Sequence, residues 1–233
     1  GAFLAYRSME FIRDDVCFQN LNVKIVGMGS GLSWSSLGPT HHTTEDISVL
    51  RAIPNLMILS PATPRQVAAC VQTEHDGPVY IKIGMNHEKE YFEDNYVHDI
   101  KKSDCLRDGK NIAVFVTGSI LDETVKACEM LEHEGISTKL INVTTIKPFN
   151  EKEVIDIVKE IDTVAVVEEH NIHGGLASII SETITYNGLN AKVIPIGLKD
   201  TFAEGYGTYA MVRKANQLDA LNIYQRMKEA YEE

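Results

Sequence analysis

The chain has 233 residues, of which 44% are hydrophobic and 24% are charged, so it can bury one large or two ordinary cores. Its formal net charge of -11 argues against a nucleic-acid partner, because such binding depends on neutralising phosphates with Lys and Arg. No apolar run approaches the roughly 20 residues of a membrane span and no leader precedes Gly1, so we expect a cytoplasmic protein without a membrane partner.

Residues 1–85 alternate between helical and strand patterns. We expect a helix over 3–13, a buried strand over 23–26, a helix over 47–52, a strand over 56–60, a helix over 64–71 and a strand over 79–83. This order is typical of a parallel sheet with right-handed crossovers. Because the pattern opens on a helix with no strand before it, we expect the first domain to be truncated on its N-terminal side.

Residues 86–110 are polar and show no sustained period, which predicts a linker. A second α/β pattern fills 111–233, with strands over 112–116, 138–143, 163–167 and 192–196 and helices over 121–134, 152–161, 176–186 and 218–233. The expected fold is therefore two three-layer α/β domains with mainly parallel sheets. The four cysteines are scattered, which predicts buried free thiols and no metal site.

The segment 30–46 lies between the strand over 23–26 and the next helix, and it contains Gly38-Pro39 and the histidines His41 and His42. This places both imidazoles at the carboxyl edge of the expected sheet, where ligands bind in open α/β folds. Histidine suits proton exchange near neutral pH, although a loop histidine is commonly just solvated. We expect Thr43-Thr44-Glu45-Asp46 to cap the helix that follows.

Two other groups of residues carry a weaker signal. Phe3 and Tyr6 share one helix face, a spacing that by itself is ordinary for core aromatics. Glu168-Glu169-His170 looks like an acid–base cluster but ends an apolar strand, and surface or interface hydrogen bonding is the plainer expectation for it. The glycines at 174 and 175 lack the spacing of a phosphate-binding loop and predict close turn packing instead.

Four motifs nevertheless occur in a familiar order: Gly1–Tyr6, Gly38–His41, Arg51–Asn55, and Val167–His170 followed by Gly174-Gly175. Their order resembles the C-terminal part of the transketolase family, which uses thiamine diphosphate. The resemblance covers nearly the whole chain. It implies that 1–85 is the later part of a pyrimidine-binding domain and that 111–233 is the family's C-terminal domain.

The resemblance also implies roles for individual residues. Phe3 and Tyr6 match the aromatic wall around the aminopyrimidine ring of the cofactor, with Tyr6 in the stacking position, and His41 matches a histidine that faces the substrate. The family's activating glutamate lies upstream of the segment matching Phe3, and the Gly-Asp-Gly motif that holds diphosphate and Mg²⁺ is absent. We therefore expect a partner section or subunit that carries both, and a dimer.

Two positions depart from the family pattern. Leu37 stands where an aspartate usually contacts donor hydroxyls, and Met85 stands where an arginine grips the sugar phosphate. Methionine cannot form charge-assisted bonds to phosphate, so we expect either a sugar substrate other than an ordinary pentose phosphate or a phosphate held elsewhere.

The expected function is that of a C-terminal section or subunit of a transketolase-like enzyme, which transfers a two-carbon ketol unit between sugars. Two alternatives stay open. Leu37 and Met85 are compatible with a non-catalytic assembly or regulatory module of the same fold. A subunit related to deoxyxylulose-phosphate synthase or to the 2-oxoacid dehydrogenase β chain is the other, although Gly38–His41 and Arg51–Asn55 favour transketolase.

Overall fold

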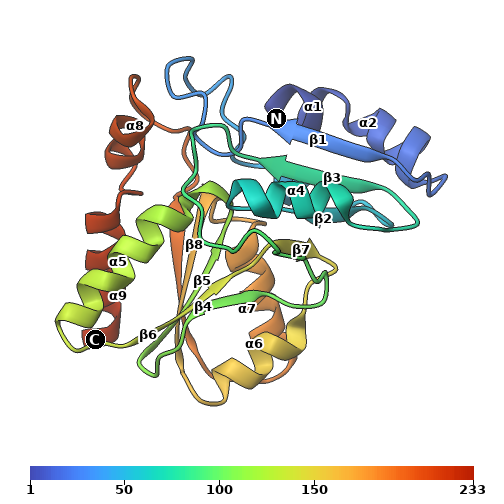
Figure 1. The fold of residues 1–233 in the computed structure, drawn as a ribbon. Helices are drawn as coiled ribbons and strands as arrows, with labels where there is room; N and C mark the ends of the chain where they lie inside the picture. The colour runs from blue at the N-terminus through green and yellow to red at the C-terminus, as the bar shows by residue number, and fades with distance from the viewer.

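The computed structural model describes all 233 residues and contains two sheets (Figure 1). The first sheet has the strand order β1 (Lys24–Met28), β3 (Val79–Ile83), β2 (Met57–Leu59) and β7 (Thr145–Lys147). The strands β1, β3 and β2 are parallel, whereas β7 pairs with β2 in the antiparallel sense.

The second sheet has the order β4 (Asp104–Arg107), β6 (Thr138–Asn142), β5 (Ile112–Thr117), β8 (Thr163–Asn171) and β9 (Lys192–Leu198). Only β4, at one edge, is antiparallel to its neighbour. Every residue of β5 is buried, as expected of a central strand with helices on both faces. The prediction of α/β architecture with two mainly parallel sheets is confirmed.

The helices of the first part are α1 (Ala2–Arg7), α2 (Met9–Phe11), the π-helical η1 (Ile12–Cys17), α3 (Asp46–Leu50) and α4 (Pro64–Gln72). Because side chains alternate along a strand, Tyr80 of β3 packs with the core that contains α1 and α3, and Ile81 packs on the α4 side. The hydroxyl of Thr63 accepts a hydrogen bond from the Gln66 amide and caps α4 ahead of Pro64.

The helices of the second part are α5 (Leu121–His133), α6 (Glu151–Val158), α7 (Leu176–Tyr186), α8 (Tyr209–Ala215) and α9 (Ala220–Glu232), with the 3-10 turn η2 (Gly118–Ile120) before α5. Helices α6 and α7 cover one face of the second sheet, and α5 and α9 cover the other (Figure 1). No helix is long and apolar enough to cross a membrane.

The two parts of the chain are not packed as independent bodies. Strand β4 lies within the expected linker 86–110 and joins the second sheet, while β7 leaves the second part to complete the first sheet. One cluster of 24 buried hydrophobic residues runs from Ala5 of α1 through Tyr80 to Ile184 of α7. The relative positions of the two sheets are therefore fixed by shared core packing as well as by the connecting chain.

Three local expectations are wrong. The strand expected to be buried at 23–26 is the edge strand β1, whose side chains at Val26 and Met28 are 40% and 54% exposed. Cys105 is an exposed thiol because it lies on the edge strand β4. The hydroxyls of Thr43 and Thr44 do not cap α3, since they bond to the Gly29 carbonyl and the Glu45 carboxylate.

Candidate functional site

The β1–α3 loop, residues 29–45, leaves the carboxyl end of β1 and is closed at its base by a two-residue bridge. The amides of Gly31 and Thr43 donate to each other's carbonyls, with N···O distances of 3.1 Å and 2.9 Å. Gly31 has a φ of +55°, and a Cβ there would lie 2.3 Å from the Glu169 carboxylate, so only glycine fits. The bridge brings the histidines at 41 and 42 back toward the sheet.

Phe3 of α1 and His41 of the loop meet at the edge of the first sheet. Their ring centroids lie 5.3 Å apart with the planes at 88°, a favourable edge-to-face contact. The Thr40 hydroxyl lies 3.0 Å from Nδ1 of His41, which fixes the imidazole on one side. Phe3 remains 51% exposed, so most of its ring surface is not used in the core.

Tyr6 is held to the end of the same loop. Its hydroxyl donates to the Glu45 carboxylate at 2.8 Å and accepts from the Glu45 amide at 3.0 Å. Burial and the carboxylates of Asp46 and Glu45 raise the pKa of Tyr6, so its hydroxyl stays protonated. The hydroxyl is thereby committed to the loop, and the partly exposed ring is what Tyr6 can offer to a ligand.

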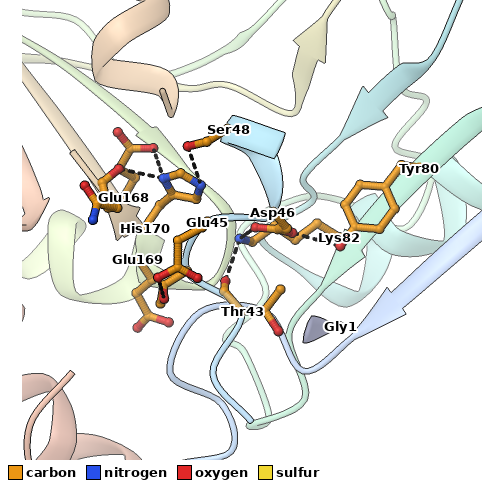
Figure 2. A network of polar contacts seen from close by, with 12 residues as sticks. Gly1, Thr43, Glu45, Asp46, Ser48, Tyr80, Lys82, Glu168, Glu169 and His170 are labelled. Atoms are coloured by element: carbon orange, nitrogen blue, oxygen red, sulfur yellow. Dashed lines mark hydrogen bonds and ion pairs between the residues drawn. The ribbon is translucent and has the colours of Figure 1, made fainter. Parts of the chain in front are cut away.

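Beneath this edge lies a buried polar cluster around Asp46 (Figure 2). Asp46 accepts a hydrogen bond from the Tyr80 hydroxyl at 2.8 Å and forms an ion pair of 2.5 Å with Lys82, whose ammonium also donates to the Thr43 carbonyl at 3.0 Å. Sequence reasoning missed this cluster. The available signal was a lysine two residues after a tyrosine in the apolar strand β3, which puts both side chains on one face.

His42 occupies a different environment from His41. It is 3% exposed, and neither ring nitrogen has a hydrogen-bond partner in the protein. Burial lowers the pKa of His42, which favours the neutral imidazole. The structure thus brings His41, but not His42, to the surface beside Phe3.

The two substrate positions predicted from the sequence lie in different surroundings. Leu37 is 47% exposed on the β1–α3 loop. Met85 is 37% exposed and lines a cavity of about 430 Å³ whose wall also includes Glu123, Asp219 and Arg213. The cavity beside Met85 therefore spans both parts of the chain and is lined by both acidic and basic side chains.

The acidic cluster at the end of β8 makes buried interface hydrogen bonds. Glu168 accepts from the amides of Leu176 and Ala177 at 2.8 Å and 2.9 Å and so caps α7. A Cβ at Gly175 would lie 2.2 Å from the Glu168 carboxylate, which confirms turn packing as the reason for glycine there. Glu169 forms an ion pair with Arg213 of α8.

The site fits one part of the cofactor that the sequence resemblance implies. The partly exposed rings at Phe3 and Tyr6, with the imidazole at His41, suit a flat aromatic ligand such as an aminopyrimidine. The residues present therefore fit the ring end of thiamine diphosphate.

Comparison with known proteins gives a consistent picture. The model of the transketolase pyrimidine-binding domain matches residues 1–84, and that of the transketolase C-terminal domain matches residues 101–223. The chain is 35% identical over 231 residues to a Methanocaldococcus jannaschii protein named as a putative transketolase C-terminal section, covering 97% of this chain and 72% of that protein. It is 34% identical over 223 residues to one of the apulose-4-phosphate transketolase subunits of Actinobacillus succinogenes, with 95% and 72% covered.

A solved structure supports the same assignment. A split-gene transketolase, described as an inactive β4 tetramer, superposes with a TM-score of 0.90 at 28% identity, covering 99% of this chain and 74% of the other. The fold thus defines an α/β chain with two mainly parallel sheets, of the kind found in transketolase chains. The chain belongs to the transketolase family and corresponds to its C-terminal section or subunit.

Proposed function

We propose that this chain is one part of a thiamine diphosphate-dependent transketolase, which transfers a two-carbon ketol unit between sugars once a partner completes the site. The observation that carries the proposal is the edge-to-face contact between Phe3 and His41, beside Tyr6, at the carboxyl edge of the first sheet. This contact joins residues expected to bind the cofactor to a residue expected to face the substrate.

Phe3 and Tyr6 would hold the aminopyrimidine ring of thiamine diphosphate, and they would fix its orientation by ring contacts rather than by hydrogen bonds. The cofactor supplies an electron sink for the two-carbon fragment when the ketose carbon–carbon bond is broken. His41, held at Nδ1 by Thr40, keeps Nε2 for proton exchange with sugar oxygens. The edge-to-face contact with Phe3 keeps that imidazole next to the ring site.

A partner chain or section is part of the proposal. This chain has the aromatic and imidazole groups but lacks the Gly-Asp-Gly motif, so the partner would bind the diphosphate and its Mg²⁺ and would supply the activating carboxylate. Two relatives support this division of the site between two chains. The Actinobacillus relative is named as one subunit of a transketolase, and a split-gene transketolase is described as inactive when it is a tetramer of its β chain. Dimerisation of the completed enzyme remains part of the same proposal.

The substrate is proposed to be a sugar that does not depend on an arginine at position 85 for phosphate binding. Leu37 offers an apolar surface where a carboxylate would bond to donor hydroxyls, and Met85 offers a thioether where a guanidinium would pair with phosphate. The methionine disfavours a phosphate held at position 85.

Reconstitution of two-carbon transfer tests the proposal. The chain is mixed with its partner, thiamine diphosphate and Mg²⁺, and formation of a ketose extended by two carbons is followed with a panel of ketose donors and aldose acceptors. We expect transfer only in the complete mixture, and a fall of about 10²–10⁴-fold in kcat/KM for His41→Ala. Complex formation with cofactor binding but without transfer would instead favour the non-catalytic module.

A further inference from the structure

Near its start, the β1–α3 loop is attached to the C-terminal domain at two points far along the chain, and near its end the Thr44 carbonyl accepts from the Asn171 amide of β8 at 2.7 Å. The Leu32 amide donates to a carboxylate oxygen of Glu169 on β8 at 3.1 Å, and the Ser35 hydroxyl donates to the Gly207 carbonyl at 2.9 Å. The ring of Tyr206 also lies against Gly38, where a Cβ would be 2.4 Å from it. The segment before α8 therefore lies along the loop that presents His41 (Figure 1).

The carboxylate of Glu169 is surrounded entirely by donors. Besides the Leu32 amide, its oxygens accept from the Ser119 hydroxyl at 3.3 Å, the Tyr209 hydroxyl at 2.7 Å and the Arg213 guanidinium. Glu169 is only 4% exposed, so water cannot take over these bonds. A glutamine at this position would turn an NH₂ group toward one of the donors, so it could not accept on both sides as the carboxylate does.

The groups that donate to Glu169 come from three separate elements. Arg213 belongs to α8, and its guanidinium also donates to the Ser119 carbonyl of η2 at 2.7 Å. The Leu32 amide belongs to the β1–α3 loop. Glu169 therefore ties the base of the loop to η2 and α8 of the C-terminal domain, and a change at this carboxylate is transmitted to the backbone at Leu32.

We propose that Glu169 is a positioning residue for the transfer reaction: it holds the β1–α3 loop so that His41 and Leu37 keep their place against the sugar. This inference rests on the proposed function. The C-terminal domain therefore contributes to sugar recognition without touching the substrate, because it positions the loop through Glu169 and the 206–207 segment.

Glu168 provides a matched control on the same strand. It is 1% exposed and also accepts two amide hydrogen bonds, but these come from the start of α7 and not from the loop. Glu168→Gln and Glu169→Gln are the same chemical change at adjacent buried positions. Both are expected to lower stability, whereas only Glu169→Gln is expected to release the loop.

The loop contains the single tryptophan of the chain, Trp34, which allows a direct readout in the full chain without any cofactor. Trp34 is half-buried between the two attachment points. For Glu169→Gln we expect stronger acrylamide quenching of Trp34 and hydrogen exchange at the Leu32 amide faster by about tenfold or more. For Glu168→Gln we expect both quantities to stay at the wild-type value. Equal changes in the two variants, or none in Glu169→Gln, would overturn the proposal.

Ser35→Ala is a second test of the loop attachment, to be used if Glu169→Gln does not fold. This variant removes only the bond to the Gly207 carbonyl and leaves the buried ion pair intact. We expect a smaller increase in Trp34 quenching in a protein with wild-type far-ultraviolet circular dichroism. Quenching identical to wild type would show that the Gly207 carbonyl does not restrain the loop, and would overturn the part of the proposal that assigns loop positioning to the 206–207 segment.

In the reconstituted enzyme, Glu169→Gln is expected to raise the KM of the sugar by about tenfold or more while the dissociation constant of thiamine diphosphate changes much less, because Phe3 and Tyr6 belong to α1, which makes no bond to Glu169. A loss of cofactor affinity equal to the rise in KM would indicate a general structural defect and contradict the positioning role. Wild-type protein that binds no cofactor with its partner would refute the proposed function, yet the Trp34 comparison would still decide whether Glu169 restrains the loop.

Discussion

Lys82 on β3 reaches Asp46 at the start of α3, with 2.5 Å between its ammonium nitrogen and the carboxylate, and both side chains are almost completely buried. The same ammonium donates to the Thr43 carbonyl, and Asp46 also accepts from Tyr80. The pair therefore fixes the point where the β1–α3 loop enters α3. Tyr6 holds the neighbouring residue, Glu45, so the floor of the site is set by contacts from two elements.

Removal of one member of this pair leaves a buried charge without its partner. For Lys82→Met we expect a decrease of about 3–5 kcal/mol in the free energy of unfolding, measured by urea denaturation. The exposed pair Lys152–Asp156 on α6 is the control, and Lys152→Met is expected to lower the free energy of unfolding far less, because water screens this pair. A loss for Lys82→Met as small as that of the control would show that the pair does not hold the loop.

Burial of His42 makes the free energy of unfolding depend on pH in the acidic range. The unfolded chain has an ordinary histidine pKa near 6.5, and burial lowers the folded-state pKa of His42 below that value. The stabilising contribution of the neutral form is thus present above pH 6.5 and is lost as pH falls through the folded pKa, because the unfolded state then binds more protons. Urea denaturation at several pH values should show this slope, and His42→Leu should flatten it. An unchanged slope in His42→Leu would assign the dependence to other groups.

The departures at Leu37 and Met85 predict an unusual substrate preference. The reconstituted enzyme should turn over xylulose 5-phosphate and unphosphorylated ketoses at comparable kcat/KM values, because neither side chain can bond to phosphate. Met85→Arg should raise the preference for the phosphorylated sugar by about tenfold. A strong preference for the phosphorylated sugar in the unmodified enzyme would mean that other residues hold the phosphate.

Much of the fold could be predicted from the sequence because its central strands are apolar runs bounded by turn residues. The strands at 79–83 and 112–116 have this form and lie within one residue of their expected ends. Strands β4 and β7 were missed because they are only four and three residues long, carry polar side chains, and gain their hydrogen bonds from partners distant in sequence. Such pairing leaves no local periodic signal.

Only the part of the candidate site that has a local sequence signal could be predicted. His41 could be found because it lies in a contiguous motif, whereas the environment of Glu169 depends on Arg213, which lies 44 residues downstream. Lys82 is buried although lysine is usually exposed, so its place could not be predicted. The sequence predicts only a helix cap for its partner Asp46. Charges paired across distant segments need the three-dimensional structure to be recognised.

The proposed function rests on the contact between Phe3 and His41, and the contribution of Phe3 to cofactor binding tests it most directly. Titration calorimetry measures thiamine diphosphate binding, in the presence of Mg²⁺, to the chain alone, to the chain with its partner, and to the Phe3→Ala complex, with Phe11→Ala as an exposed aromatic control. We predict binding only with the partner, an affinity about tenfold weaker for Phe3→Ala, and a wild-type affinity for Phe11→Ala. Equal affinity in the wild-type and Phe3→Ala complexes, or no binding in either, would contradict the assignment of this edge of the sheet as the cofactor site.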